Sequence, residues 1–185
     1  MVIRPPAPLS SSSRTWKAKR PGRAREEADG AGRPGAYSSR MKILDLEPGD
    51  ARLAADLLPV LRELRPHLTE DLFREVYEKG HAQGLRFSAA YDDEGACVGA
   101  AGWRIVDNTS QIRMLYVDDL VTAEGARSTG VGRRLLGHLE GRARAAGCLH
   151  LNLDSGTQRT DAHRFYLRER LSIVAFNFDK VLDLD

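Results

Sequence analysis

A glycine-rich loop at the start of a helix is the segment of this sequence that is best equipped for chemistry. Residues 127–133 read Arg-Ser-Thr-Gly-Val-Gly-Arg and run into an amphipathic pattern. The first N–H groups of a helix have no partner within the helix, and the helix dipole is positive at that end. Gly130 and Gly132 allow close approach to the backbone, while Arg127 and Arg133 add positive charge. The loop therefore predicts an anion site, most simply for a phosphate.

Two common nucleotide-binding motifs do not describe this loop. A P-loop requires Gly-Lys-Ser/Thr, and residues 130–133 read Gly-Val-Gly-Arg. A dinucleotide fingerprint requires Gly-x-Gly-x-x-Gly within a parallel βαβ unit and an acidic residue about twenty positions later. Taken alone, the pattern of arginine and two glycines also fits a helix start whose glycines are incidental.

The elements around the loop predict an α/β (α+β) fold with a mixed, mostly antiparallel central sheet and helices on both faces. Three segments rich in strand-forming residues, 85–91, 96–106 and 111–122, are joined by short turns and predict an antiparallel meander. A helix is expected over 131–146, with Gly147 at its end. The other expected elements are a strand at 42–46, a helix at 51–64 with a kink at Pro59, a helix at 69–77, a strand at 149–154, a helix at 161–169 and a final strand pair at 173–184.

A second motif follows the loop at a characteristic distance. Leu151-Asn152-Leu153-Asp154 is followed by Ala162-His163-Arg164-Phe165-Tyr166. Together, the two motifs resemble the GCN5-related N-acetyltransferases (the GNAT family) over about residues 41–180. The resemblance implies an acyl-CoA N-acyltransferase fold that moves the acetyl group of acetyl-CoA to a primary amine, on a small molecule or on a protein N-terminus or lysine.

The resemblance also implies which residues bind the cosubstrate, with no metal. The fourth strand would pair with the pantetheine through Leu120 N–H and Thr122, and the loop would bind the pyrophosphate. Arg159 replaces an asparagine common in the family and would pair with a cofactor phosphate. Residues 168–171 replace the usual Gly-Phe, so the acceptor side of the site is expected to differ. The full predicted set is Leu120, Val121, Thr122, Arg127, Ser128, Thr129, Gly130, Val131, Gly132, Arg133 and Arg159.

Amine acetylation needs a base and an acid. At pH 7 an alkyl amine with a pKa of about 10.4 is deprotonated in about one molecule in 2,500, a handicap of roughly 4.6 kcal/mol. By resemblance, Tyr166 protonates the leaving thiolate, and an ordinary core tyrosine is the alternative. The base is Asp154 or Asp118, and each is also open to a purely structural role. Strand alternation sends Asp118 and Asp119 to opposite faces unless a bulge intervenes.

The acceptor itself is left open by the sequence. The segment 64–84 and the last strands are expected to contact it, with His67, Glu70, Tyr77 and His81 as candidates that are also ordinary surface types. Cys97 and Cys148 lack metal-ligand spacing and a histidine pattern, so direct transfer without an acyl-cysteine is expected. A non-catalytic module that binds acyl-CoA is the alternative function.

Composition divides the 185-residue chain into a tail and a domain. Residues 1–40 contain nine basic and three acidic residues and five of the eight prolines, so we expect a disordered basic tail. Alternatively, the start codon is placed too far upstream, the protein begins at Met41 and residues 1–40 are translated leader sequence. As functions of the segment, a nucleic-acid arm and an Arg- and Ser-rich transit peptide are weaker alternatives. Residues 41–185, with 19 basic and 23 acidic residues, are the expected N-acetyltransferase domain. We expect a cytoplasmic protein without a membrane partner, and a homodimer is compatible with the sequence.

Overall fold

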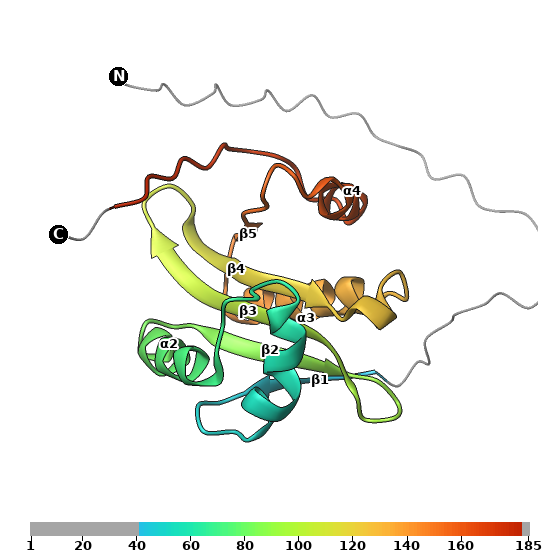
Figure 1. Ribbon diagram of the computed structural model, residues 1–185. Helices are drawn as coiled ribbons and strands as arrows, with labels where there is room; N and C mark the ends of the chain where they lie inside the picture. The colour runs from blue at the N-terminus through green and yellow to red at the C-terminus, as the bar shows by residue number, and fades with distance from the viewer. Residues whose placement is uncertain (1–40, 183–185) are drawn as a thin grey trace, which may run out of the picture. The chain divides into compact units, whose positions relative to one another are not determined.

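A five-stranded mixed sheet organises the protein in the computed structural model, which describes residues 41–182 (Figure 1). Its strands are β1 (Lys42–Leu46), β2 (Arg86–Tyr91), β3 (Cys97–Asn108), β4 (Ile112–Thr122) and β5 (His150–Leu153). They lie side by side in sequence order, and every neighbouring pair is antiparallel except β4 with β5, which is parallel. The predicted fold class is confirmed. The predicted tail, residues 1–40, lies outside the described residues.

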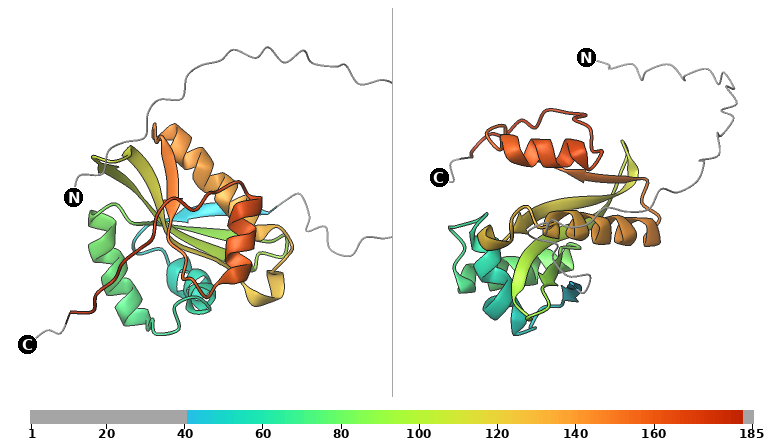
Figure 2. Two further views of the ribbon diagram at one scale, coloured as in Figure 1. Left: turned by 90° about the horizontal axis from the view of Figure 1, so that it is seen from above. Right: turned by 90° about the vertical axis from the view of Figure 1, so that its right-hand side faces the viewer.

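Helices cover both faces of this sheet, because alternate strand residues point to opposite sides. One core joins the sheet to η1, α1 and α2, and includes Leu57, Tyr77 and Phe87; the other joins it to α3 and includes Leu115 and Leu135. Beyond β5 lies α4, none of whose residues is buried (Figures 1 and 2). The helical elements are η1 (Leu53–Leu57), α1 (Leu58–Arg62), α2 (Glu70–Ala82), η2 (Glu124–Ala126), α3 (Val131–Ala145) and α4 (Thr160–Arg168).

The predicted helix at 51–64 is present but broken by its proline. Residues Leu53–Leu57 form a π turn, in which Leu58 N–H donates to Leu53 O, and a regular helix follows from Leu58. Pro59 has no N–H to donate to the preceding turn, so the backbone before it widens. Pro59 then lies at the start of α1, where a missing N–H costs nothing.

The prediction of a final strand pair at 173–184 is wrong for residues 173–182. Residues 173–182 adopt no regular secondary structure, and residues 183 and 184 lie outside the described residues. The apolar composition fits a strand, but a strand also needs a neighbour for its backbone groups. Among residues 41–182 this segment has none, and β5 remains at the edge of the sheet.

A left-handed residue ends α4 just before that segment. Arg170 has φ +70°, and Leu171 N–H donates to Tyr166 O at 3.0 Å while Arg170 N–H donates to Leu167 O at 3.1 Å. This pair of bonds is a Schellman motif, whose left-handed position usually carries glycine.

The described residues contain no helix that is both long and apolar enough to cross a bilayer.

Tyr77 is one of the predicted acceptor contacts, but it is a core residue. Its ring is 2% exposed, and its hydroxyl donates to Leu46 O at 2.6 Å. Burial raises its pKa to about 12, which keeps the hydroxyl a donor at any physiological pH.

Replacing Tyr77 with Phe is expected to cost about 1–2 kcal/mol of unfolding free energy, because the Leu46 carbonyl loses its partner. Urea unfolding measures this loss. KM for the acceptor should stay unchanged, and a raised KM with unaltered stability would return Tyr77 to the site.

Candidate active site

The gap between β4 and β5 is the feature on which the site is built. The two strands pair from Met114 with His150 to Val117 with Leu153, and the pairing stops there. Beyond Val117, β4 continues to Thr122 while pairing with β3 alone. One edge of the segment 118–122 therefore keeps backbone groups free for a ligand.

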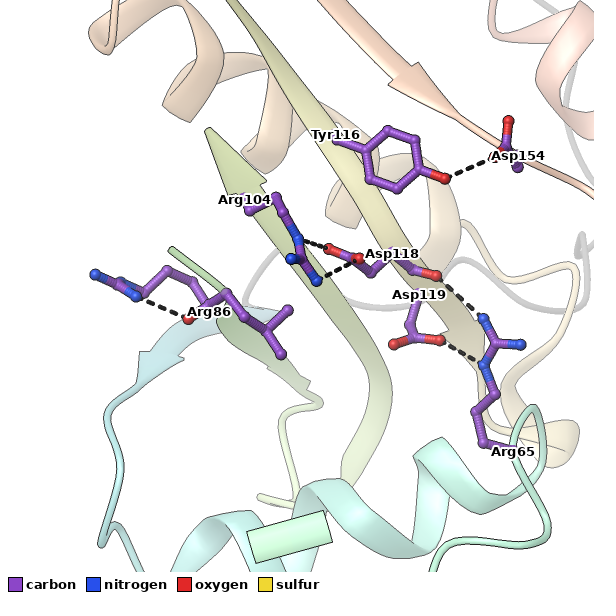
Figure 3. A network of polar contacts seen from close by, with 8 residues as sticks. Arg65, Arg86, Arg104, Tyr116, Asp118, Asp119 and Asp154 are labelled. Atoms are coloured by element: carbon purple, nitrogen blue, oxygen red, sulfur yellow. Dashed lines mark hydrogen bonds and ion pairs between the residues drawn. The ribbon is translucent and has the colours of Figure 1, made fainter. Parts of the chain in front are cut away.

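A β-bulge at Asp118 accompanies this parting of the strands. Val117 lies opposite Trp103 and Asp119 lies opposite Gly102, so Asp118 is the extra residue of β4. A bulge bends its strand and breaks the alternation of side chains. The exception allowed in the prediction therefore applies, because a bulge intervenes, and Figure 3 shows Asp118 and Asp119 on the same side of β4.

A cavity occupies the gap and gathers five of the predicted site residues. It is lined by β4, by β5 and the loop after it, by the turn that follows α1 and by α4. The predicted residues among its lining are Asp118, Leu120, Asp154, Arg159 and Tyr166, and Ala162 lines it one helical turn before the tyrosine. Residues from four elements thus meet where the strands separate.

Two arginines hold two of the aspartates at this site (Figure 3). Arg104 donates to both oxygens of Asp118, at 2.7 and 2.9 Å. Arg65 donates to Asp119 at 2.8 Å and also to the Asp118 carbonyl at 3.3 Å. Burial raises the pKa of Asp119, and the Arg65 guanidinium opposes that rise. Both carboxylates are thus committed to partners within the protein.

Asp154 has a different environment. It follows β5 directly and accepts a hydrogen bond from the Tyr116 hydroxyl at 2.7 Å, across the gap between the strands. Asn177 Nδ2 also donates to it, at 2.9 Å. Burial, followed by the bond to Asp154, raises the pKa of Tyr116 to about 12, so Tyr116 remains a donor. Within residues 41–182 Asp154 forms no ion pair, so it is the exposed carboxylate at the cavity without a cation.

Tyr166 lines the cavity from α4. Burial raises the pKa of its hydroxyl, and the charge of Arg159 acts in the opposite direction. No hydrogen bond joins this hydroxyl to another of the described residues. A protonated phenol without a partner inside the described protein is free to act on a ligand.

The glycine-rich loop has the geometry of an anion site. Gly130 has φ +96° and caps α3, and Arg134 N–H makes the first bond of the helix, to Gly130 O at 3.1 Å. The four N–H groups of residues 130–133 therefore have no partner within the helix. A Cβ at Gly130 would meet nothing within 4 Å, so this glycine is required for its conformation. A Cβ at Gly132 would lie 3.4 Å from Phe165 Cζ, an ordinary contact.

Other residues of the predicted cofactor set serve this loop in different ways. Val131 is buried and anchors the helix start in the core, and Thr129 Oγ1 donates to Ala126 O. Ser128 has φ +63°, and Val121 and Thr122 lie at the end of β4. Arg127 pairs with Glu63 at 3.2 Å and Arg133 with Glu169 at 3.4 Å. These arginines are 58% and 77% exposed, so a phosphate can displace such weak pairs.

The four predicted acceptor contacts do not line the cavity. Besides the buried Tyr77, His81 pairs with Glu47 at 2.9 Å, and Glu70 pairs with Arg74 at 3.1 Å. His67 is exposed. Within the predicted segment 64–84, the residues that reach the cavity are Leu64 and Arg65.

Sequence reasoning missed Arg65, Tyr116 and Asn177. Tyr116 had a usable signal, because it lies two positions before Asp118 and alternate strand residues share a face. Arg65 is 54 residues from Asp119 in the sequence, and no local pattern connects them. Asn177 lies in the segment that was predicted to be a strand.

Residues 51–170 match the family described as Acetyltransferase (GNAT) family. The chain belongs to the GNAT family. This acetyltransferase domain carries the motif that the sequence resemblance identified, at the helix start observed in the structure. The chain is therefore an acyltransferase by family.

A relative agrees with this assignment to the GNAT family, and solved structures share the fold. The Bacillus subtilis (strain 168) protein named Uncharacterized N-acetyltransferase YhdJ is 50% identical over 112 residues, which are 60% of this chain and 79% of that protein. The glucosamine-6-phosphate N-acetyltransferase of Arabidopsis thaliana has a similar fold, with a TM-score of 0.62 at 18% identity over 78% of this chain and all of that one. The aminoglycoside N-acetyltransferase AAC(6')-Iy, solved with CoA, has a TM-score of 0.64 at 17% identity over 80% of this chain and 95% of that one.

Gly132→Val is expected to weaken acetyl-CoA binding by about tenfold or more, which corresponds to about 1.4 kcal/mol. The added methyl groups occupy the approach to the helix N-terminus, while the Cβ itself has room in the free protein. Isothermal titration calorimetry measures the affinity, and the melting temperature checks the fold.

Gly137→Val is the matched control for this variant. It makes the same change on the same helix, five residues after Gly132, and a Cβ there meets nothing within 4 Å. Equal affinity of the two folded variants would show that the loop does not bind the phosphates.

Proposed function

We propose that this protein is an N-acetyltransferase that transfers the acetyl group of acetyl-CoA directly to a primary amine of a small molecule or protein. The observation that carries the proposal is the cavity at the parting of β4 and β5, where a free strand edge, Tyr166 and Asp154 meet. A module that only binds acyl-CoA does not need, at the same cavity, a phenol without a hydrogen-bond partner and a carboxylate without an ion pair among residues 41–182.

The described residues fit acetyl-CoA in two separate places. The edge at 118–122 suits the amides of the pantetheine, with Leu120 N–H directed to the thioester carbonyl oxygen and Thr122 to an amide. The start of α3 suits the pyrophosphate, with Arg127 and Arg133 adding charge. Acetyl-CoA supplies an acetyl thioester, which an amine nitrogen can attack. Arg159 lines the cavity and adds a further positive charge.

Tyr166 is the proposed acid. Burial raises the pKa of its hydroxyl, which favours the protonated form that an acid needs. A solution thiol has a pKa near 8.5, so its departure as a thiolate benefits from a proton supplied nearby. The Tyr166 O–H supplies that proton to the sulfur, and Ala162 leaves room beside it.

Asp154 is the proposed base, acting on the amine directly or through a water. Its lone pairs are already oriented by Tyr116 and Asn177, and no cation of the described residues competes for its charge. Asp118 is the weaker candidate, because a bidentate guanidinium holds both of its oxygens. We assign Asp118 to shaping the cavity and binding Arg104.

Direct transfer is supported by the state of the cysteines. Burial raises the pKa of the Cys97 thiol to about 11, so it is protonated at neutral pH and a poor nucleophile. Neither Cys97 nor Cys148 lines the cavity. The amine nitrogen therefore attacks the thioester without an acyl-enzyme.

Tyr166→Phe should lower kcat by about 10² or more, because it removes the proton donor and keeps the ring. Acetyl-CoA affinity and melting temperature should change little, since the hydroxyl has no partner among the described residues. Steady-state kinetics with thiol-release detection over a panel of amines measures the effect. An unchanged kcat would make Tyr166 a packing residue.

Asp154→Asn should lower kcat/KM for the amine by about 10² at pH 7. The loss should shrink as pH approaches the amine pKa of about 10.4, because the free amine no longer needs a base. The pH profile of kcat/KM measures this recovery. Asp118→Asn is the matched variant, and the assignment fails if it shows the recovering profile and Asp154→Asn does not.

A further inference from the structure

Arg65 lines the active-site cavity from the turn that follows α1. Its backbone is fixed on both sides, because its N–H donates to Leu61 O at 2.9 Å and its carbonyl accepts from Leu68 N–H at 3.1 Å. Pro66, the next residue, further restricts the conformations that Arg65 can adopt. The turn therefore presents this side chain from a fixed position.

The guanidinium of Arg65 uses only one of its two edges within the protein. Nε donates to Asp119 Oδ1 at 2.8 Å, and Nη2 donates to the Asp118 carbonyl at 3.3 Å. Of its five N–H groups, three have no partner among the described residues, and two of these are on Nη1. Figure 3 shows the third nitrogen pointing away from both aspartates. The Nη1–Nη2 edge, which can bind a carboxylate or a phosphate through two parallel hydrogen bonds, is thus open.

Asp119 holds this guanidinium in place. The Asp119 side chain is 13% exposed and that of Arg65 is 45% exposed, so the pair extends outward from the sheet. Because the arginine is already ordered by the pair, an anion that binds it has less rotamer freedom to remove. The pair therefore forms a preorganised donor group at the cavity wall.

Asp154 presents the complementary group at the same cavity. Tyr116 and Asn177 both donate to its Oδ2, and no described residue donates to its Oδ1. No cation among residues 41–182 pairs with this carboxylate. The cavity thus has an open carboxylate oxygen and an open guanidinium edge.

Arg65 lies away from the proposed pyrophosphate site. The free edge of β4 runs from 118 to 122, and the pyrophosphate site lies beyond residue 122, at the start of α3. Arg65 binds the other end of this edge, at Asp118 and Asp119. Four residues of extended strand span about 13 Å. Arg65 is therefore at the end of the edge that is left for the acceptor.

Arg159, the other cation at the cavity, serves the cosubstrate instead. Its charge acts on the pKa of Tyr166, so it lies close to the proposed acid. That acid donates its proton to the cosubstrate sulfur. Arg159 therefore belongs to the cosubstrate side, and Arg65 remains for the acceptor.

We propose that the acceptor is a small primary amine that carries a carboxylate or a phosphate, with its ammonium at Asp154 Oδ1 and its anion at the Nη1–Nη2 edge of Arg65. This inference rests on the proposed function and narrows it to acidic amines. A neutral amine leaves the edge of Arg65 unused, and a second cation on the acceptor is repelled by it. The cavity volume of about 120 Å³ favours a short molecule, because most ligand pockets hold about 300–1,000 Å³.

Steady-state kinetics with four amines tests the proposal. β-Alanine and O-phosphoethanolamine carry an anion two carbons from the amine, and ethanolamine and ethylenediamine carry a hydroxyl and a second amine there. The measured quantity is the acid preference, which is kcat/KM for an acidic amine divided by kcat/KM for ethanolamine at equal free-amine concentration. In the unaltered chain it should be about tenfold or more and should arise in KM, because Arg65 binds the acceptor without entering the chemistry. The two acidic amines distinguish a carboxylate from a phosphate.

Two variants of the Arg65–Asp119 pair should move the acid preference in opposite directions. Arg65→Gln with Asp119→Asn removes the cation without leaving a charge unpaired, and should lower the preference about tenfold. Asp119→Asn alone keeps the guanidinium and removes its internal anion, so it should raise the preference. The matched control is Arg113→Gln with Asp107→Asn, because Arg113 also binds a carboxylate and a backbone carbonyl, that of Ala146, but does not line the cavity. This control should keep the preference of the unaltered chain.

The outcomes separate this inference from the proposed function. Acetylation with an acid preference near one, or with a preference that neither variant of the pair changes, overturns the acidic acceptor and leaves the acetyltransferase in place. A lowered preference in folded Asp119→Asn also overturns it, and this single variant decides the question if the melting temperature shows that the double variant is unfolded. Thiol release with none of the four amines, in a chain that binds acetyl-CoA, overturns the proposed function and this inference with it.

Discussion

The end of backbone pairing between β4 and β5 is the constraint on which the rest of the site depends. Parallel strands that stay paired leave no free backbone groups between them, and here pairing stops at Val117 and Leu153. The bulge at Asp118 coincides with this point and turns β4 away from its neighbour. The cavity, the free edge of β4 and the positions of Tyr166 and Asp154 around it all follow from that separation.

Charge pairing then decides which carboxylate remains available. Arg104 and Arg65 neutralise Asp118 and Asp119, which lie beside one another because of the bulge. Without these partners, the two adjacent aspartates would repel each other. Their arginines allow both to remain as structural carboxylates. Asp154 instead receives only neutral donors, which leaves its charge for a cationic amine.

Periodicity and glycine placement made much of this architecture predictable. The meander, the long helix after Gly130 and the mixed sheet follow from local patterns that the structure confirms. A bulge near Asp118 was foreseen only as an exception to strand alternation, because its presence depends on the register of β4 against β3, which periodicity does not contain. The role of Arg65 depends on a contact across 54 residues. The segment 173–182 was predicted as strands from its composition, but strand formation also requires a neighbour, which composition does not contain.

The central claim is that the unpaired edge of β4 and the start of α3 bind acetyl-CoA. Amide hydrogen exchange, resolved by residue with and without acetyl-CoA, tests it most directly. The account predicts slower exchange at residues 118–122 and 128–133 in the presence of acetyl-CoA, and little change at 114–117, which already pair with β5. Unchanged exchange at both segments, or slowing confined to a distant element such as α2, would contradict it.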